Sequence, residues 1–147
     1  MAAIRRAEAT WSGALTTGSG EVSGVSSGAF SALPVTWASR TEASDGRTSP
    51  EELVAAAHAS CFAMALNATV GRKGGSIAKT DVTATVTADK GDSGIKITTS
   101  KLSVTAHGLT GIPKDQFADV AREAEKGCPV SNALRGSLQI ELDAKAV

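Results

Sequence analysis

The stretch SPEELVAAAHASCFAMAL, residues 49–66, decides the fold of this chain, because it has the form of one long helix with a defined start. Ser49 can accept a hydrogen bond from the backbone N–H of Glu52, and the Glu52 side chain can reach back to the N–H of Ser49. Pro50 has the fixed φ angle that suits a first helical position. Together these residues predict a helix that begins with a full capping box.

The body of this helix is almost entirely apolar. Between residues 53 and 66 the only strongly polar side chain is His58, and a helix that is apolar all round is typical of a protein interior. The pattern predicts a buried central helix that ends near Gly71. It places Cys61 in dry surroundings, where the thiol needs a nearby cation if it is to ionise.

Strand patterns lie on both sides of the central helix. The first forty residues alternate short mixed segments with glycine and serine turns, which predicts three antiparallel strands, the last closed by Arg40. A hairpin, an amphipathic helix and a final strand follow. The predicted strands are 9–15, 20–26, 29–39, 81–88, 95–106 and 137–144, with the second helix at 112–126. The order βββ-α-ββ-α-β predicts an α+β fold with antiparallel sheets around the long buried helix.

Length and charge narrow the functional classes. The chain has 147 residues, which predicts one domain over 1–147 with a core of its own. Fifteen basic and fifteen acidic residues cancel, and three Phe and two Trp are the only aromatic residues. Nucleic-acid binding favours a basic surface and stacking aromatic side chains, so we expect no nucleic acid as a partner.

The first residues, MAAIRRAEATW, contain no apolar run typical of a signal peptide, and we expect no membrane span and a cytoplasmic protein. Two cysteines in such a chain are more often free, metal-bound or redox-active than a structural bridge. The second, Cys128, lies between Gly127 and Pro129, where one helix can stop and a short one can start. A helix N-terminus favours a thiolate there.

Three motifs together resemble the OsmC/Ohr family of thiol-dependent organic hydroperoxide reductases, and more closely its OsmC branch. These motifs are SPEELVAAAHASCFAMAL, the later GCPVSNAL at 127–134, and Arg40 in VTWASRTE ahead of both. They occur in the order and at the separation typical of the family, and the resemblance covers most of the chain.

The resemblance implies a role for each of four residues. Cys61 would be the peroxidatic cysteine, Cys128 the resolving cysteine, Arg40 the activating cation and Glu51 the carboxylate that holds the arginine. It also implies an intertwined homodimer with two sites at the interface and a dithiol reductant such as a lipoylated protein. We expect no cofactor and no metal at the site.

The chemistry of peroxide reduction requires these residue types. A thiolate attacks one oxygen, a donor stabilises the departing alkoxide, and a second thiol condenses with the sulfenic acid before it oxidises further. A guanidinium cannot lose its proton, and a bidentate bond from Glu51 would fix the plane of Arg40. The apolar neighbours Phe62, Met64 and Leu66 would favour an alkyl or aryl hydroperoxide over hydrogen peroxide.

Helix geometry bears on whether the site is shared between subunits. Glu51 and Cys61 are ten residues apart on one helix, about 15 Å at a rise of about 1.5 Å per residue. One arginine cannot easily touch both in one chain. If Arg40 bridges the carboxylate and the thiolate, these come from different subunits.

Other functions use the same residues. His58, Cys61, His107 and Cys128 are ligand types for zinc, with His58 and Cys61 on one helix face, although their spacing matches no common zinc finger. A structural disulfide would close a long loop. A non-enzymatic redox sensor would use the two cysteines too, but would oxidise once rather than turn over.

Overall fold

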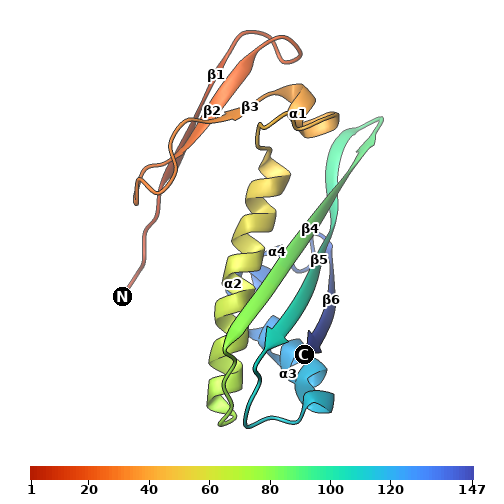
Figure 1. Cartoon of the computed structure of the whole chain (residues 1–147). Helices are drawn as coiled ribbons and strands as arrows, with labels where there is room; N and C mark the ends of the chain where they lie inside the picture. Colours follow the sequence, from red (N-terminus) through yellow and green to blue (C-terminus); the bar gives the residue numbers. More distant parts are fainter. The chain divides into compact units, whose positions relative to one another are not determined.

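A computed structural model describes all 147 residues and consists of two compact units, Met1–Leu53 and Val54–Val147. Each unit has its own three-stranded sheet, and the long helix α2, Pro50–Arg72, begins in the first unit and continues into the second (Figure 1). The predicted α+β class and the long central helix are confirmed. The expectation of one domain stays a prediction.

The first unit is an antiparallel meander followed by a short helix. Its strands β1 (Ala7–Ser12), β2 (Ser19–Gly24) and β3 (Leu33–Val35) pair in chain order, as predicted. The third strand is much shorter than the predicted 29–39, because residues 29–32 form a bend and irregular chain and helix α1 (Trp37–Thr41) takes over the end of the segment. The Thr36 side chain accepts from the Ser39 N–H and the Ser39 hydroxyl accepts from the Thr36 N–H, each at 3.0 Å, and this capping box starts the helix.

Helix α2 starts at the predicted place with a different cap. The backbone N–H of Glu52 donates to the Ser49 hydroxyl at 3.2 Å, which is one half of the expected capping box. The other half is absent, because the Glu52 carboxylate accepts from the Thr48 hydroxyl at 2.9 Å. The helix ends after Arg72, near the predicted Gly71, and the chain turns at Gly74, whose φ of 80° favours glycine.

The second unit combines a three-stranded sheet with helices. Strands β4 (Lys79–Gly91) and β5 (Gly94–His107) form the predicted antiparallel hairpin, and β6 (Gln139–Ala146) pairs in parallel with β5. The connecting segment forms a short 3₁₀ turn, η1 (Lys114–Gln116), then α3 (Phe117–Gly127) and α4 (Pro129–Leu134). Pro129 stands at the start of α4, as expected for a residue without a backbone donor.

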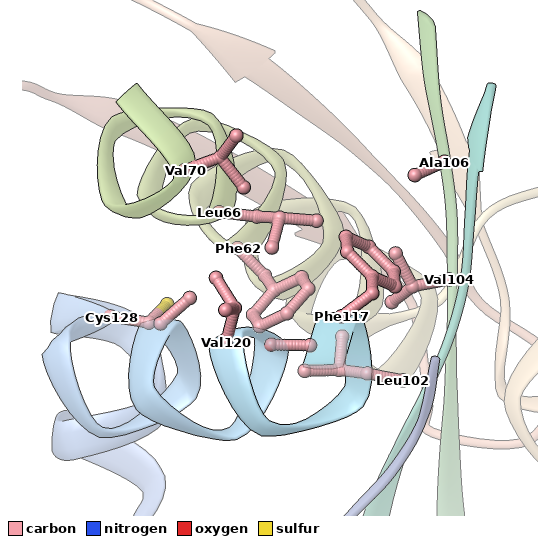
Figure 2. Close-up of a cluster of buried hydrophobic side chains, with 11 residues drawn as sticks. Phe62, Leu66, Val70, Leu102, Val104, Ala106, Phe117, Val120 and Cys128 are labelled. Carbon is pink, nitrogen blue, oxygen red and sulfur yellow. The ribbon is translucent and has the colours of Figure 1, made fainter. Parts of the chain in front are cut away.

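The core of the second unit lies between α2, β5 and α3. Figure 2 shows apolar side chains from these three elements pointing toward one another, with Cys128 at the edge of the cluster. Phe62, Phe117, Leu66 and Leu102 are the largest of its fully buried apolar side chains. The hairpin therefore packs on one face of the central helix through β5.

The rest of α2 is less buried than its composition suggested. Within this chain its buried side includes His58, Phe62 and Leu66, whereas the Met64 side of the helix is open, with Met64 69% exposed. By length and composition alone, the helix could also cross a membrane. This corrects the expectation that the chain contains no segment of that length and hydropathy. Because α2 supplies the core of the second unit, we assign it as the core helix.

Replacing Leu66 with alanine is expected to lower the free energy of unfolding by about 2–5 kcal/mol, because the side chain is fully buried and its loss leaves a cavity. The Val147→Ala variant is the matched control, since Val147 is 52% exposed and should change stability by less than about 0.5 kcal/mol. Urea unfolding followed by circular dichroism measures both. Equal losses would contradict the assignment of Leu66 to the core, and a single transition would support one cooperative domain.

Candidate active site

The arginine and the carboxylate predicted to act together form an ion pair within the first unit. Arg40 lies in the last turn of α1, not at the end of a strand as predicted, because the Thr36 cap turns the chain into a helix there. Glu51 lies in the first turn of α2, where the helix dipole stabilises a negative charge. The two side chains are 30% and 11% exposed, so the pair is partly shielded from water.

The geometry of this pair differs from the expected bidentate fork. Nε of Arg40 donates to Oε1 of Glu51 at 2.9 Å, and Nη2 lies 2.8 Å from the same oxygen. The second carboxylate oxygen, Oε2, is buried and has no hydrogen-bond partner. One oxygen thus holds one edge of the guanidinium, and Nη1 can still bind another group.

A pocket of about 280 Å³ adjoins Arg40 within the first unit. Apart from Arg40, its lining is mainly apolar and consists of Trp11, Leu15, Thr36, Trp37 and Pro50. Both tryptophans of the chain therefore line this pocket. The only sequence signal for the pocket was that Trp37 lies three residues before Arg40.

The two cysteines come together in the second unit, and both are free thiols. Cys61 projects from the middle of α2 and is half-buried, whereas Cys128 is fully buried at the junction of α3 and α4. Burial raises the pKa of the Cys61 thiol; a hydrogen bond from the Val130 backbone opposes this, and the neighbouring Cys128 thiol raises the pKa further. Within its own unit, Cys61 is therefore more accessible than Cys128, but less acidic than a free thiol.

Cys61 also lines a pocket of about 360 Å³ between α2 and the α3–α4 junction. Its walls are mainly small or apolar and include Met64, Ala68 and Pro129, with Arg72 as the charged member. Of the three apolar neighbours singled out in the sequence, only Met64 lines this pocket. Phe62 and Leu66 are ordinary core residues, because they lie on the opposite, fully buried side of the helix.

The four candidate zinc ligands are not gathered into one cluster. No three His, Cys, Asp or Glu side chains are arranged to hold a metal ion. His58 has its Nδ1 2.7 Å from the Ser100 hydroxyl and its Nε2 2.8 Å from the Ser131 hydroxyl, so neither ring nitrogen is available. His107 pairs with Asp81 instead, with 2.8 Å between its Nε2 and the carboxylate.

The predicted site residues are thus brought together as two pairs, each inside one unit. Arg40 contacts Glu51, and Cys61 adjoins Cys128. The sequence missed the involvement of Val130, which acts through its backbone and so has no signature in its side chain. It also missed Ser100 and Ser131, which become visible only once the partners of a buried histidine are known.

Comparison with known proteins agrees with the fold and the motifs. Residues 43–143 match the family model described as OsmC-like protein. Peroxiredoxin OsmC of Escherichia coli is 36% identical over 146 residues, which is 99% of this chain and 100% of that protein. An organic hydroperoxide resistance protein-like 2 from Staphylococcus saprophyticus is 34% identical over 65% of this chain and 66% of its own length.

Solved structures give the same relationship. The organic hydroperoxide resistance protein OhrB of Bacillus subtilis superimposes with a TM-score of 0.73 at 25% identity, covering 95% of this chain and 98% of that one. Sequence and fold agree over nearly the whole chain, and on both grounds the chain belongs to the OsmC-like protein family.

Proposed function

We propose that this protein is a peroxidase that reduces organic hydroperoxides to alcohols with electrons from thiols. The observation that carries the proposal is the thiol pair, in which a half-buried Cys61 facing a pocket adjoins a fully buried Cys128. The names of two relatives, peroxiredoxin OsmC and organic hydroperoxide resistance protein-like 2, support a redox role related to hydroperoxides.

The reaction runs in three steps. The Cys61 thiolate attacks the terminal oxygen of the hydroperoxide, the O–O bond breaks, and the leaving alkoxide takes a proton to become the alcohol. The oxidised Cys61 is now a sulfenic acid, which the Cys128 sulfur attacks; a disulfide forms and water leaves. An external dithiol then reduces the disulfide by exchange and is itself oxidised to a disulfide.

Arg40 has the charge and the free edge that the first step needs. Its guanidinium stays protonated, and with Nε and Nη2 on one Glu51 oxygen it can direct Nη1 at the peroxide. A positive charge near Cys61 would offset the rise that burial causes in the pKa of that thiol. The mainly apolar pockets beside Arg40 and Cys61 favour alkyl or aryl hydroperoxides over hydrogen peroxide.

The complete site is proposed to form in a homodimer. Ten residues of α2 separate Glu51 from Cys61, about 15 Å along the helix axis, so an arginine held by Glu51 does not easily reach the thiol of its own chain. The open side of α2 around Met64 leaves apolar surface for a second copy to cover. A cytoplasmic location, where cysteines stay reduced and lipoylated proteins can supply a dithiol, completes the proposal.

Substrate consumption tests this function directly. We expect repeated turnover of cumene and tert-butyl hydroperoxides with dihydrolipoamide or dithiothreitol as the reductant, and slower turnover with hydrogen peroxide or with glutathione. The readout is loss of peroxide under excess reductant. A protein that consumed only one equivalent per site would be a redox sensor rather than an enzyme.

One equivalent of organic hydroperoxide is expected to convert the two thiols into an intrachain Cys61–Cys128 disulfide. The two side chains already adjoin in the reduced protein, and such a bond requires Cα atoms within about 7 Å. Peptide mapping without reductant measures the linkage. Finding only bridges between subunits would contradict the assignment of Cys128 as the resolving thiol.

A further inference from the structure

His58 is the one buried histidine of the chain, and the proposed chemistry does not use it. Its side chain is fully buried, as are those of its two partners, Ser100 on β5 and Ser131 on α4. Burial lowers the pKa of His58, although the Glu125 carboxylate opposes this. The neutral ring has one donor and one acceptor nitrogen, and a serine hydroxyl can complement either.

His58 and its partner Ser131 are each three residues away from one of the two cysteines. His58 and Cys61 are three residues apart on one face of α2, and Ser131 lies on α4 three residues after Cys128, the residue that precedes this helix. His58 contacts Ser131 while Cys61 adjoins Cys128. As the residue number rises from His58 to Cys61 along α2, the number of the partner falls from Ser131 to Cys128. The two segments therefore run in opposite directions. The His58–Ser131 hydrogen bond is one helical turn from the thiol pair.

Besides the His58–Ser131 bond, a hydrogen bond from the Val130 backbone to the Cys61 thiol ties α4 to the central helix. Helix α4 has only six residues, and its first turn is fixed by local backbone bonds, from the Cys128 N–H to the Glu125 carbonyl at 3.1 Å and from the Asn132 N–H to the Cys128 carbonyl at 3.0 Å. These bonds shape the turn but do not hold it on α2. The 2.8 Å bond between His58 and Ser131 does so together with the Val130 bond, and Ser100 anchors the opposite ring nitrogen of His58 to the sheet.

We propose that His58 is a positioning residue for disulfide closure: through Ser131 it sets the register of α4 on α2 and so keeps the Cys128 sulfur within reach of Cys61. The inference deepens the proposed function, because closure is its second step. The role of His58 does not depend on peroxide, because disulfide closure must follow the oxidation of Cys61 by any oxidant.

Ser131 and Ser100 provide a matched pair of variants. Each serine-to-alanine change removes one hydroxyl from the same buried imidazole, at almost the same distance, so their costs in global stability should be similar. Only Ser131 lies on α4, the helix that directly follows Cys128. Ser131→Ala should therefore weaken closure by about tenfold, and Ser100→Ala by a much smaller factor.

The first measurement is the equilibrium between the reduced protein and glutathione. Cys61 attacks oxidised glutathione and releases one reduced glutathione; Cys128 then attacks the mixed disulfide and releases the second, so the equilibrium constant reports the effective concentration of Cys128 at Cys61. We expect this concentration to fall about tenfold in Ser131→Ala relative to Ser100→Ala. Equal effects in the two variants would overturn the proposal and leave His58 a purely structural residue.

A second pair of variants changes His58 itself. His58→Gln keeps one donor and one acceptor, whereas His58→Leu keeps neither, so the glutamine variant should retain more of the effective concentration. If His58→Leu does not fold, the serine pair still decides the question. Failure of wild-type protein to turn over hydroperoxide, with the expected difference between the serine variants in glutathione, would reject the proposed function and leave the role of His58 standing.

Discussion

Replacing Cys61 with serine is expected to abolish hydroperoxide turnover, leaving only the uncatalysed reaction of peroxide with the dithiol. The serine hydroxyl does not ionise near neutral pH and cannot form a sulfenic acid, so the first step has no nucleophile. The change replaces one half-buried atom by a smaller one and should leave the fold intact. Peroxide consumption under excess dithiothreitol measures the loss.

Cys128→Ser is the matched variant, with the same atomic change at the second thiol. It should leave the first oxidation intact and stall afterwards, because no resolving thiol attacks the sulfenic acid. A sulfenic-acid probe should label Cys61 after one equivalent of peroxide, and excess peroxide should drive it to the sulfinic acid. Mass spectrometry distinguishes the two products. Equal loss of the first oxidation in both variants would contradict the division of roles.

Arg40→Met is expected to slow oxidation by organic hydroperoxide on the order of 10²–10³-fold, the usual cost of removing one donor from a developing oxyanion. Part of this loss of rate should come from a higher pKa of the Cys61 thiol. Burial already raises the pKa of Cys61, and without the proposed cation that pKa should rise further, by at least about one unit. Because the thiolate predominates only above the pKa, the rate–pH curve should move to higher pH.

Two measurements separate the two roles of the arginine. Thiolate absorbance titration gives the change in the Cys61 pKa, and stopped-flow oxidation rates, corrected for thiolate fraction, give the remaining loss of alkoxide stabilisation. Glu51→Gln should cause a smaller loss of the same kind, since it loosens the guanidinium without removing it. An Arg40→Met protein with unchanged pKa and rate would remove the arginine from the mechanism.

Mixed dimers test whether the site is shared between subunits. Arg40→Met and Cys61→Ser chains are each expected to be nearly inactive alone. If Arg40 of one chain serves Cys61 of the other, a mixed dimer has one site with both intact residues, and mixing should restore part of the activity. No recovery, with mixed dimers shown to form, would place both residues of a site in the same chain.

The sequence by itself predicted the elements whose pattern is local. The Ser-Pro-Glu-Glu start and the alanine-rich run defined α2, because capping and helix propensity act over a few residues. The alternation of residues 81–106 predicted the β4–β5 hairpin for the same reason. The motifs were also sufficient to identify the family, and so the chemistry expected of Cys61 and Cys128.

Other features depended on competition between neighbouring groups. The segment before Arg40 reads as a strand, yet the reciprocal Thr36–Ser39 bonds make it helical. Glu52 was expected to bond the N–H of Ser49, but the Thr48 hydroxyl takes its carboxylate. In each case two bonding arrangements were available to the same residues, and residue types alone did not distinguish them.

Tertiary structure alone decided which distant groups meet. It turned one side of α2 into core and left Met64 open, although the composition is apolar on both sides, because only one side meets β5 and α3. It buried Cys128 more deeply than Cys61. It placed Ser100 and Ser131, 42 and 73 residues away in sequence, on the two nitrogens of His58. Such contacts depend on how elements pack, and packing at long sequence separation has no local signature in the chain.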